Sequence, residues 1–430
     1  MKFSRQQEEA LSEIKVWFKN RDKAPFILNG YAGTGKSTIA KYISEILGIH
    51  MENVIYVSYT GKAALNLRNK GCDGATTVHK LLYTPVENNK KVMDDLSEAI
   101  KSLDEGDCYK YEANHLRRLH AIEKEIVDKL TFSKQPDWER VARSDIIVVD
   151  ESSMINMEIA RDLHDLGLPV IYFGDPFQIP PVEGRSPIQS YDANFVLTEV
   201  HRQALDSPIV RYATNLRKDK YFSQVEMESI NGEEKFSIIR KSKATYPLYE
   251  MHDQVICSLN RNRHTINKWF HEKKISDCLV EETDNGGLGV NDKIVFLSND
   301  DKKGIYNGHV GHVSSVMPSM NDKGEVEDDY LRIAGRLDDM EFSNYRVFTK
   351  NIYQSKPERH QGPSINLGWA LTVHKSQGSE WDNVLFHYGY LRPDLYEGEH
   401  YMAKLVYTAI TRAKKICTVV VPDPKCEAFA

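Results

Sequence analysis

The sequence has few of the features that mark membrane, secreted or zinc-binding proteins. Its six cysteines form no C-x-x-C pair and no zinc spacing, which argues against a zinc site and favours reduced thiols in the cytoplasm. No apolar run approaches the about 20 residues that span a bilayer, and residues 1–18 lack the apolar core of a signal peptide. The formal net charge of −6 excludes a surface coated in positive charge but leaves room for one basic groove.

Residues 25–47 predict a nucleoside triphosphate site. Residues 26–28 form a short apolar run, residues 30–37 read G-x-x-x-x-G-K-S, and aliphatic residues then recur at helical spacing. Glycines let backbone N–H groups turn toward phosphate oxygens. In this strand–loop–helix context we expect Lys36 to reach the β- and γ-phosphates of ATP and the Ser37 hydroxyl to bind Mg²⁺. The other predicted nucleotide ligands of the loop are Gly30, Ala32, Gly33, Thr34, Gly35 and Thr38.

Polar residues follow two further apolar runs. Residues 146–149 predict a buried strand that ends in Asp150 and Glu151, the Walker B arrangement. Asp150 would hold Mg²⁺, and Glu151 would orient and deprotonate the attacking water. Residues 170–173 predict another strand, after which Gln178 is placed to sense the γ-phosphate. Read alone, each stretch also fits an ordinary core strand followed by a polar or Pro-rich loop; beside the P-loop, the carboxylate pair becomes a strong signal.

The order of motifs resembles that of superfamily 1 helicases, specifically the RecD/Dda branch, superfamily 1B. The stretch SRQQEEAL resembles the Q-motif, VSYTGKAALNL motif Ia, ATTVHKLL the Thr-x-His motif, LTVHKSQGSEWD motif V and LVYTAITRAKK motif VI. VVDESSM, GDPFQIPPV and LTEVHRQ are similar to the segments between them. The chain departs from the family at Tyr59, where proline usually precedes Thr60, and in the length of residues 84–144.

The resemblance implies an α/β fold with two RecA-like P-loop motor domains, each a parallel sheet flanked by helices, and an insertion in each. A length of 430 residues permits two to four domains. We expect the first motor domain at 1–83 and 145–200, a helical arm at 84–144, the second motor domain at 201–290 and 362–430, and a small SH3-like β-barrel at 291–361. The arm would be a strand-separating pin, a partner-binding element or a solvated spacer.

Within the predicted barrel, the residues supply two local signals. Asn307-Gly308 is a strong short-hairpin signal between β-rich runs. His309 and His312 form H-x-x-H, but at strand spacing they point to opposite faces, so we reject a metal site there.

Several nucleotide contacts follow from the resemblance alone. It implies that Gln7 recognises adenine, that Glu380 hydrogen-bonds the ribose, and that Arg202 and Arg412 act as arginine fingers. An arginine from a second domain stabilises the charge that develops on the γ-phosphoryl group and is worth ~10³–10⁵ in rate. The plain alternative for either arginine is a surface ion pair.

Candidate DNA ligands come from four segments of the chain. Residues 254–274 read as a strand and a basic, amide-rich helix that would meet phosphates, with a solvated helix face as the alternative for Lys273 and Lys274. Ser376 has no companion acid and His374 no metal partners, so residues 371–382 fit a segment that couples DNA to ATP. The predicted DNA ligands are Thr60, Lys62, Thr77, His79, Asn260, Arg263, Thr372, His374 and Lys375.

The resemblance implies an ATP-dependent single-stranded-DNA translocase and DNA helicase of 5′-to-3′ polarity, and the P-loop and Walker B residues predict that it uses ATP and Mg²⁺. A nucleotide kinase or regulatory P-loop ATPase would leave motifs V and VI unexplained, and a helicase–nuclease would need a metal-binding carboxylate cluster that the sequence lacks. The expected partners are single-stranded DNA, DNA junctions, and replication or recombination proteins. Because the chain starts near the Q-motif, we expect a compact, free-standing monomer, similar to phage Dda, in the cytoplasm of a bacterial or phage-infected cell.

Overall fold

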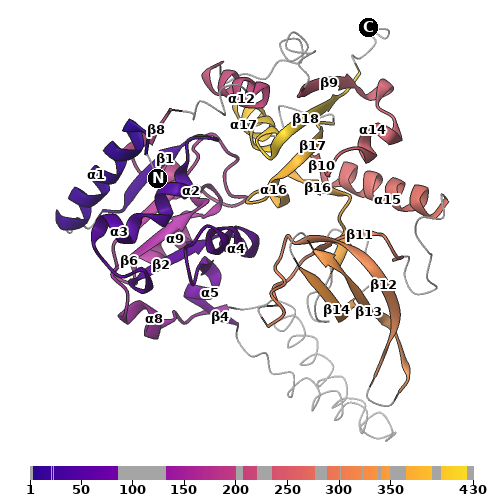
Figure 1. Cartoon of the computed structure of the whole chain (residues 1–430), viewed down its shortest axis with the longest axis horizontal. Coiled ribbons are helices and arrows are strands. Elements are labelled where there is room, and N and C mark those ends of the chain that lie inside the picture. The colour runs from indigo at the N-terminus through magenta and orange to yellow at the C-terminus, as the bar shows by residue number, and fades with distance from the viewer. Residues whose placement is uncertain are drawn as a thin grey trace, which may run out of the picture.

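The computed structural model describes residues 3–20, 22, 24–85, 132–199, 207–219, 235–276, 288–300, 302–321, 324–337, 340–348, 365–389 and 399–423. Within these ranges the chain forms two parallel sheets and one antiparallel sheet (Figure 1). The first parallel sheet, in indigo and magenta, lies beside the second, in yellow and orange. The antiparallel sheet lies below the second parallel sheet in this view. None of the described helices is both long and apolar enough to cross a bilayer.

The first sheet is parallel throughout, with strand order β3-β2-β6-β7-β1-β8. Its strands are β1 (Phe26–Gly30), β2 (Val54–Ser58), β3 (Thr76–Thr77), β6 (Ile146–Asp150), β7 (Val170–Gly174) and β8 (Phe195–Leu197). Every residue of β1, β2, β6 and β7 is buried, as expected for strands that helices cover on both faces. The strands predicted at 26–28, 146–149 and 170–173 are therefore confirmed.

Helices cover both faces of the first sheet. One hydrophobic core joins the sheet to α1 (Arg5–Asn20), α2 (Lys36–Lys41), α3 (Ile43–Leu47) and α4 (Gly61–Asn69). The other core joins it to α5 (Val78–Leu82), α8 (Trp138–Ala142) and α9 (Met157–His164). The helical run after the P-loop is interrupted at Tyr42, which separates α2 from α3. The remaining short helices are η1 (Met51–Asn53), η2 (Ser152–Met154) and α10 (Pro187–Ser190).

The second sheet is also parallel, with strand order β16-β10-β17-β18-β9. Its strands are β9 (Phe236–Arg240), β10 (Gln254–Cys257), β16 (Ala370–Thr372), β17 (Trp381–His387) and β18 (Ala413–Val421). The helices around it are α12 (Pro208–Asp219), η3 (Lys241–Lys243), α14 (Tyr246–Glu250), α15 (Asn260–Ser276), α16 (Val373–Ser376) and α17 (Glu399–Ile410). Two parallel, helix-flanked sheets confirm the predicted α/β class with two RecA-like domains.

The antiparallel sheet, here called the inserted sheet, has the order β14-β13-β12-β11-β15. Its strands are β11 (Lys293–Phe296), β12 (Val310–Met320), β13 (Val326–Leu337), β14 (Glu341–Phe348) and β15 (Ile365–Leu367). Its core contains Phe296, Ile333 and Tyr345. Strand β15 lies just beyond the boundary expected at 361, and an SH3-like closure stays a prediction.

The Asn307-Gly308 prediction needs a correction. These residues do occupy a tight turn, in which the His309 N–H donates to the Tyr306 carbonyl at 2.9 Å and Gly308 has φ 91°. The turn does not by itself join two strands, because β11 ends at Phe296 and the chain makes a longer excursion, residues 297–309, before β12. We call residues 297–309 the insert loop.

The predicted helical arm falls mostly outside the described residues. Its base is a two-stranded antiparallel ribbon of β4 (Tyr83–Pro85) and β5 (Phe132–Lys134). Helix α8 lies in the range assigned to the arm, yet its Val141 is buried in the core of the first domain. Within residues 132–144, therefore, the chain has already returned to the motor domain.

Candidate functional site

The P-loop has the backbone conformation that a phosphate cradle requires. Gly33 and Gly35 both have φ 80°, in the left-handed region that side chains disfavour. At Gly30 an added Cβ would lie 2.8 Å from Thr34 Oγ1 and 2.9 Å from Lys36 Cγ, so the loop closes tightly here. Helix α2 then starts at Lys36, and its first N–H groups face the loop.

Lys36 and Gln7 both lie at this loop. Lys36 Nζ donates to the carbonyl oxygens of Gly30 at 2.6 Å and Tyr31 at 3.1 Å. The ammonium is thus held over the loop and would exchange these carbonyls for phosphate oxygens. Gln7 is buried, and its Nε2 donates to the Thr34 carbonyl at 3.2 Å, so the Q-motif contacts the P-loop directly.

The residues predicted to bind metal lie close together: Ser37 is in α2, which follows β1, and Asp150 ends β6, with β7 between these two strands. Ser37 Oγ lies 3.4 Å from Asp150 Oδ2, and the Glu151 N–H donates to Asp150 Oδ1 at 3.0 Å. A hydroxyl and a carboxylate are oxygen ligands of the kind that Mg²⁺ takes beside substrate phosphates and water. In the described ranges no cluster of three or more His, Cys, Asp or Glu side chains could hold a metal. The donor set therefore fits a phosphate-bound Mg²⁺ rather than an all-protein metal cage.

Glu151 and Arg412 face each other across the two domains. Glu151 sits in a left-handed backbone conformation, with φ 51°. Desolvation raises the pKa of its carboxyl, the Arg412 guanidinium opposes this shift, and the Asp150 carboxylate adds to it. Arg412 is 4% exposed, and its Nε and Nη1 donate to the carbonyls of Thr408 at 3.1 Å and Ser379 at 3.4 Å. A carboxylate with a raised pKa beside a positioned guanidinium is suited to general-base chemistry on a phosphoryl group.

Tyr407 joins the two domains at the nucleotide site, and the sequence analysis did not single it out. Its hydroxyl donates to Asp175 Oδ2 at 2.6 Å and accepts the Ala32 N–H at 2.9 Å. The segment around Gln178 is fixed to the same helix, since the Ile179 N–H donates to Thr408 Oγ1 at 3.0 Å. Both residues of this bridge, Tyr407 and Asp175, stand inside motifs already quoted, which is the signal that could have revealed them.

A cavity of about 460 Å³, here called the nucleotide cavity, opens between the two motor domains. Of the P-loop only Ser37 lines it, together with Asp150, Glu151, Arg412 and Glu380. Lys62 also lines it, with its Nζ 5.7 Å from the centroid of the Trp381 ring. Lys62 was expected at DNA; its position in the first turn of α4 points it to the nucleotide side instead.

Predicted DNA ligands of motif V and of the Thr-x-His motif line two further cavities. The first, about 420 Å³, is lined by Tyr59, His374 and Lys375, with Pro180 to Glu183 opposite. The second, about 330 Å³, is lined by Thr77, His79 and Tyr306. Tyr59 of the first cavity and His79 of the second have rings 5.3 Å apart and edge-on, so the two cavities are adjacent. We call the two cavities together the groove.

The three predicted threonines share one structural role. Thr60, Thr77 and Thr372 are the N-caps of α4, α5 and α16, and each side chain accepts a backbone N–H three residues on. Each hydroxyl is still able to donate its own proton to a phosphate oxygen. The threonines therefore fix the first turns of these helices, whether or not they touch a ligand.

Two neighbouring cations, Arg263 and Lys375, lie on the second-domain side of the groove, and Glu183 lines the same cavity as Lys375. Arg263 is 2% exposed, and burial lowers the pKa of its guanidinium. Lys375 is accessible to solvent, yet the protein around it and then Arg263 lower the pKa of its ammonium to about 8. Burial also lowers the pKa of His374 and His79. Like charges held together in this way favour an anion as the ligand.

Three further predictions have different outcomes. Asn260 is exposed at the start of α15, on the same helix as Arg263. Lys274 instead forms an ion pair with Glu250 and lies 5.5 Å from the centroid of the Trp369 ring. Arg202 lies outside the described residues, so its role as a finger stays a prediction.

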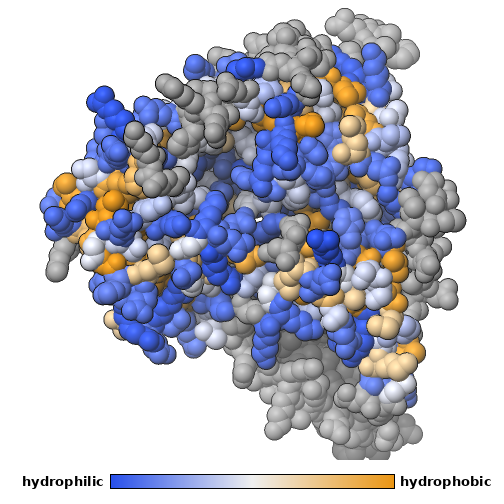
Figure 2. Space-filling view, in the orientation of Figure 1, coloured by the Kyte–Doolittle hydropathy of each residue, from blue (hydrophilic) through white to orange (hydrophobic). Residues whose placement is uncertain are grey.

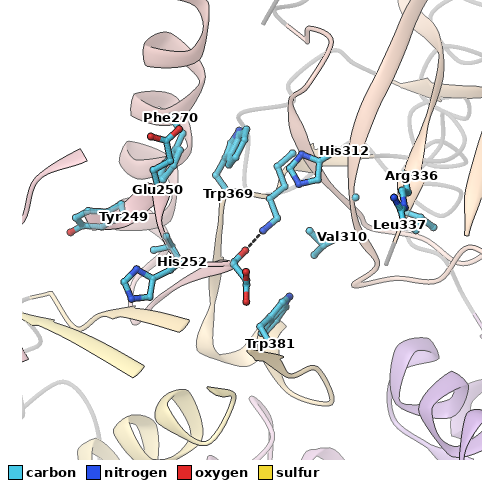
Figure 3. Close-up of a pocket in the computed structure, with 14 residues that line it drawn as sticks. Tyr249, Glu250, His252, Phe270, Val310, His312, Arg336, Leu337, Trp369 and Trp381 are labelled. Atoms are coloured by element: carbon cyan, nitrogen blue, oxygen red, sulfur yellow. Dashed lines mark hydrogen bonds between the residues drawn. The ribbon is translucent and has the colours of Figure 1, made fainter. Parts of the chain in front are cut away.

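A larger cavity, about 580 Å³, lies between the second sheet and the inserted sheet (Figure 3). Trp369 stacks on Phe270 at 5.1 Å, and His312 and Arg336 approach from the inserted sheet. It lies at the starts of β10 and β17, whereas His374 and Lys375 follow the end of the parallel strand β16. It contains none of the predicted site residues.

Known proteins share this arrangement. Family models match residues 2–233, described as an AAA domain, and residues 367–420, described as a UvrD-like helicase C-terminal domain. The ATP-dependent RecD2 DNA helicase of Deinococcus radiodurans is 26% identical over 408 residues, covering 90% of this chain and 46% of its own length. The ATP-dependent DNA helicase PIF1 of Saccharomyces cerevisiae is 25% identical over 214 residues, which cover 46% of this chain and 22% of its own length.

Solved structures agree on the fold. Pif1 helicase from Bacteroides, in complex with ADP-AlF3 and single-stranded DNA, superposes with a TM-score of 0.54 at 21% identity, covering 99% of this chain and 93% of its own. Pif1 helicase from Candida albicans superposes with a TM-score of 0.53 at 17% identity, covering 98% of this chain and 94% of its own. Because the AAA-domain model spans more than half of the chain, and both motor domains carry the expected motifs, the chain belongs to the RecD- and Pif1-like helicases of superfamily 1B.

Proposed function

We propose that this chain is an ATP-driven motor that moves along single-stranded DNA from 5′ to 3′ and separates duplex DNA. The RecD2 relative is named as a DNA helicase, and the Bacteroides neighbour is described with a nucleotide analogue and single-stranded DNA. The chain spans less than half the length of RecD2, so the activity is argued from its own residues.

The observation that carries the proposal is the position of motif V. His374 and Lys375 line the groove, whereas Gly378 and Glu380, a few residues later, line the nucleotide cavity. The segment is also attached to the first domain at its centre, because Asn66 Nδ2 donates to the Gly378 carbonyl at 3.0 Å. A change at the nucleotide therefore reaches the groove through one short, hydrogen-bonded segment.

On the nucleotide side, the residues divide the work of ATP hydrolysis. Mg²⁺, held by Ser37 and Asp150, would neutralise charge on the β- and γ-phosphates. Glu151 accepts a proton from the attacking water, and Lys36 and Arg412 stabilise the charge on the γ-phosphoryl oxygens. Because Arg412 and Tyr407 come from the second domain, full activity requires both domains to close on the nucleotide.

On the groove side, the chemistry suits a single strand. Arg263 and Lys375 would pair with backbone phosphates, and the helix starts capped by threonines supply further N–H donors. Tyr59 and His79 offer ring faces at which a base can stack, worth ~1–3 kcal/mol per base. Figure 2 shows mostly hydrophilic side chains over the junction of the domains, in keeping with a polar ligand.

Two measurements test the function. Lys36→Ala should abolish DNA-stimulated ATPase and unwinding while the protein still folds, because the ammonium no longer reaches the phosphates; Lys41→Ala, in the exposed last turn of the same helix, is the control. On duplexes with a single tail, ATP should drive unwinding of the 5′-tailed substrate alone. Unwinding only from the 3′ tail would overturn the polarity. ATPase activity insensitive to single-stranded DNA would favour another class of P-loop ATPase.

A further inference from the structure

The nucleotide cavity extends well beyond the groups that perform hydrolysis. Its inner end is formed by Ser37, Glu151 and Arg412. From there it follows helix α4 past Asn66 and Asn69 to Lys70, which is exposed. The space thus connects the γ-phosphate position to solvent by a route that does not pass the rest of the P-loop.

The sheet order shows that this route leaves on the far side from the adenine end. Gln7 lies on α1, whose neighbour Gln6 bonds to Thr198 just after β8. The cavity follows the helix after β2, and β6 and β7 lie between β2 and the P-loop strand β1. With ADP in the P-loop, a route along α4 would pass neither the rest of the nucleotide nor Gln7.

The charges along the cavity are graded in a way that suits an anion. Asp150 and Glu151 stand at the inner end, and Lys62 is the first cation beyond them along α4, 9% exposed. The Lys62 Nζ lies 5.7 Å from the centroid of the Trp381 ring, which also lines the cavity. Farther out, Lys414 lies 3.9 Å from Glu380 at the mouth. At the inner end Arg412 offsets the carboxylates, and Lys62 and then Lys414 offer further positive charge to a phosphate ion on its way out.

We propose that the nucleotide cavity is the exit route for inorganic phosphate, and that Lys62 is its transient binding residue. The inference rests on the proposed function, because it requires hydrolysis of ATP to ADP and phosphate. It assigns Lys62 a product-binding role rather than the DNA contact that its motif suggested. His309 of the insert loop also lines the cavity. The route is therefore bounded by residues of both motor domains and of the insert loop.

Inhibition of DNA-stimulated turnover by added inorganic phosphate tests this role directly. Lys62→Met keeps a long apolar side chain against Trp381 and removes the charge. We expect it to raise the inhibitory phosphate concentration about tenfold, since a charge-assisted contact is lost. Lys62→Arg should restore the wild-type value. Lys415→Met is the control. Lys415 pairs with Asp382 and does not line the cavity, so this variant should have the wild-type inhibitory phosphate concentration.

A second readout separates the route from a packing role. Phosphate release, followed with a fluorescent phosphate-binding protein, should lag behind hydrolysis measured by chemical quench in Lys62→Met more than in the wild type. Equal phosphate inhibition in Lys62→Met and wild type, or a wild type that added phosphate does not inhibit, would overturn the inference. If the wild type hydrolyses no ATP with DNA, the proposed function itself fails, which is a different result.

Discussion

We expect Lys375 to make the affinity for single-stranded DNA, the proposed ligand of the groove, dependent on pH between pH 7 and pH 9. In the free protein the pKa of its ammonium is lowered to about 8, by the surrounding protein and by Arg263. A bound phosphate supplies the missing negative charge and returns the pKa toward the ordinary value of about 10.4. Binding above pH 8 therefore requires uptake of a proton, and affinity falls as pH rises.

The size of the effect follows from these two values. At pH 7 about nine in ten free molecules carry the charged Lys375, and at pH 9 about one in ten do, while the bound form stays charged. The dissociation constant should then rise about tenfold from pH 7 to pH 9, which is about 1.4 kcal/mol. Because Lys375 is accessible to solvent, screening reduces this figure, and we expect a rise of about threefold to tenfold.

Fluorescence anisotropy of labelled oligo-dA at constant ionic strength, without nucleotide, measures this dependence. Lys375→Arg should give a nearly flat profile, because a guanidinium stays charged throughout the range. Lys375→Met should bind more weakly at pH 7 and also lose the slope. A wild type whose affinity is constant from pH 7 to pH 9, or a Lys375→Arg variant with the wild-type slope, would refute the reasoning.

Three substitutions test the contacts between domains. Tyr407→Phe leaves the buried Asp175 carboxylate without its hydroxyl donor, so urea unfolding should show a loss of about 1–3 kcal/mol and DNA-stimulated ATPase should fall; unchanged values in both assays would contradict the bridge. Arg412→Lys should lower kcat by at least ~10²-fold with little change in nucleotide binding, since only a guanidinium keeps the required geometry; a kcat near the wild-type value would contradict the finger role. Tyr306→Phe removes the 2.9 Å hydrogen bond from Arg68, and a loss of about 1 kcal/mol in stability is expected; a gain would contradict it.

Local signals in the sequence were sufficient to predict three strands of the first sheet and the P-loop. The three strands predicted in the first sheet, β1, β6 and β7, read as apolar runs because helices cover both faces, and the segments that follow them therefore meet at one edge. For this reason the sequence alone predicted that Ser37, Asp150 and Glu151 lie close together.

Contacts that depend on side-chain direction could not be predicted in the same way. Lys62 stands two residues after Thr60, yet the start of α4 between them turns its side chain to the nucleotide cavity. Tyr407 contacts Ala32, which is 375 positions away in the sequence. Hydrophobic periodicity describes only local structure and does not predict a contact between residues so far apart. The Asn307-Gly308 signal correctly predicted a turn but wrongly predicted a short hairpin between two strands. Turn propensity does not say which strands a turn joins.

The insert loop has a mechanical consequence. Tyr306 bonds to Arg68 and lines the groove, while His309, in ring contact with Tyr306 at 5.3 Å, lines the nucleotide cavity. Any force that tilts the inserted sheet is therefore transmitted to both places at once. A motor built in this way should slow under an opposing load partly by holding its hydrolysis products longer, so its stalling force should depend on the concentration of phosphate as well as of ATP.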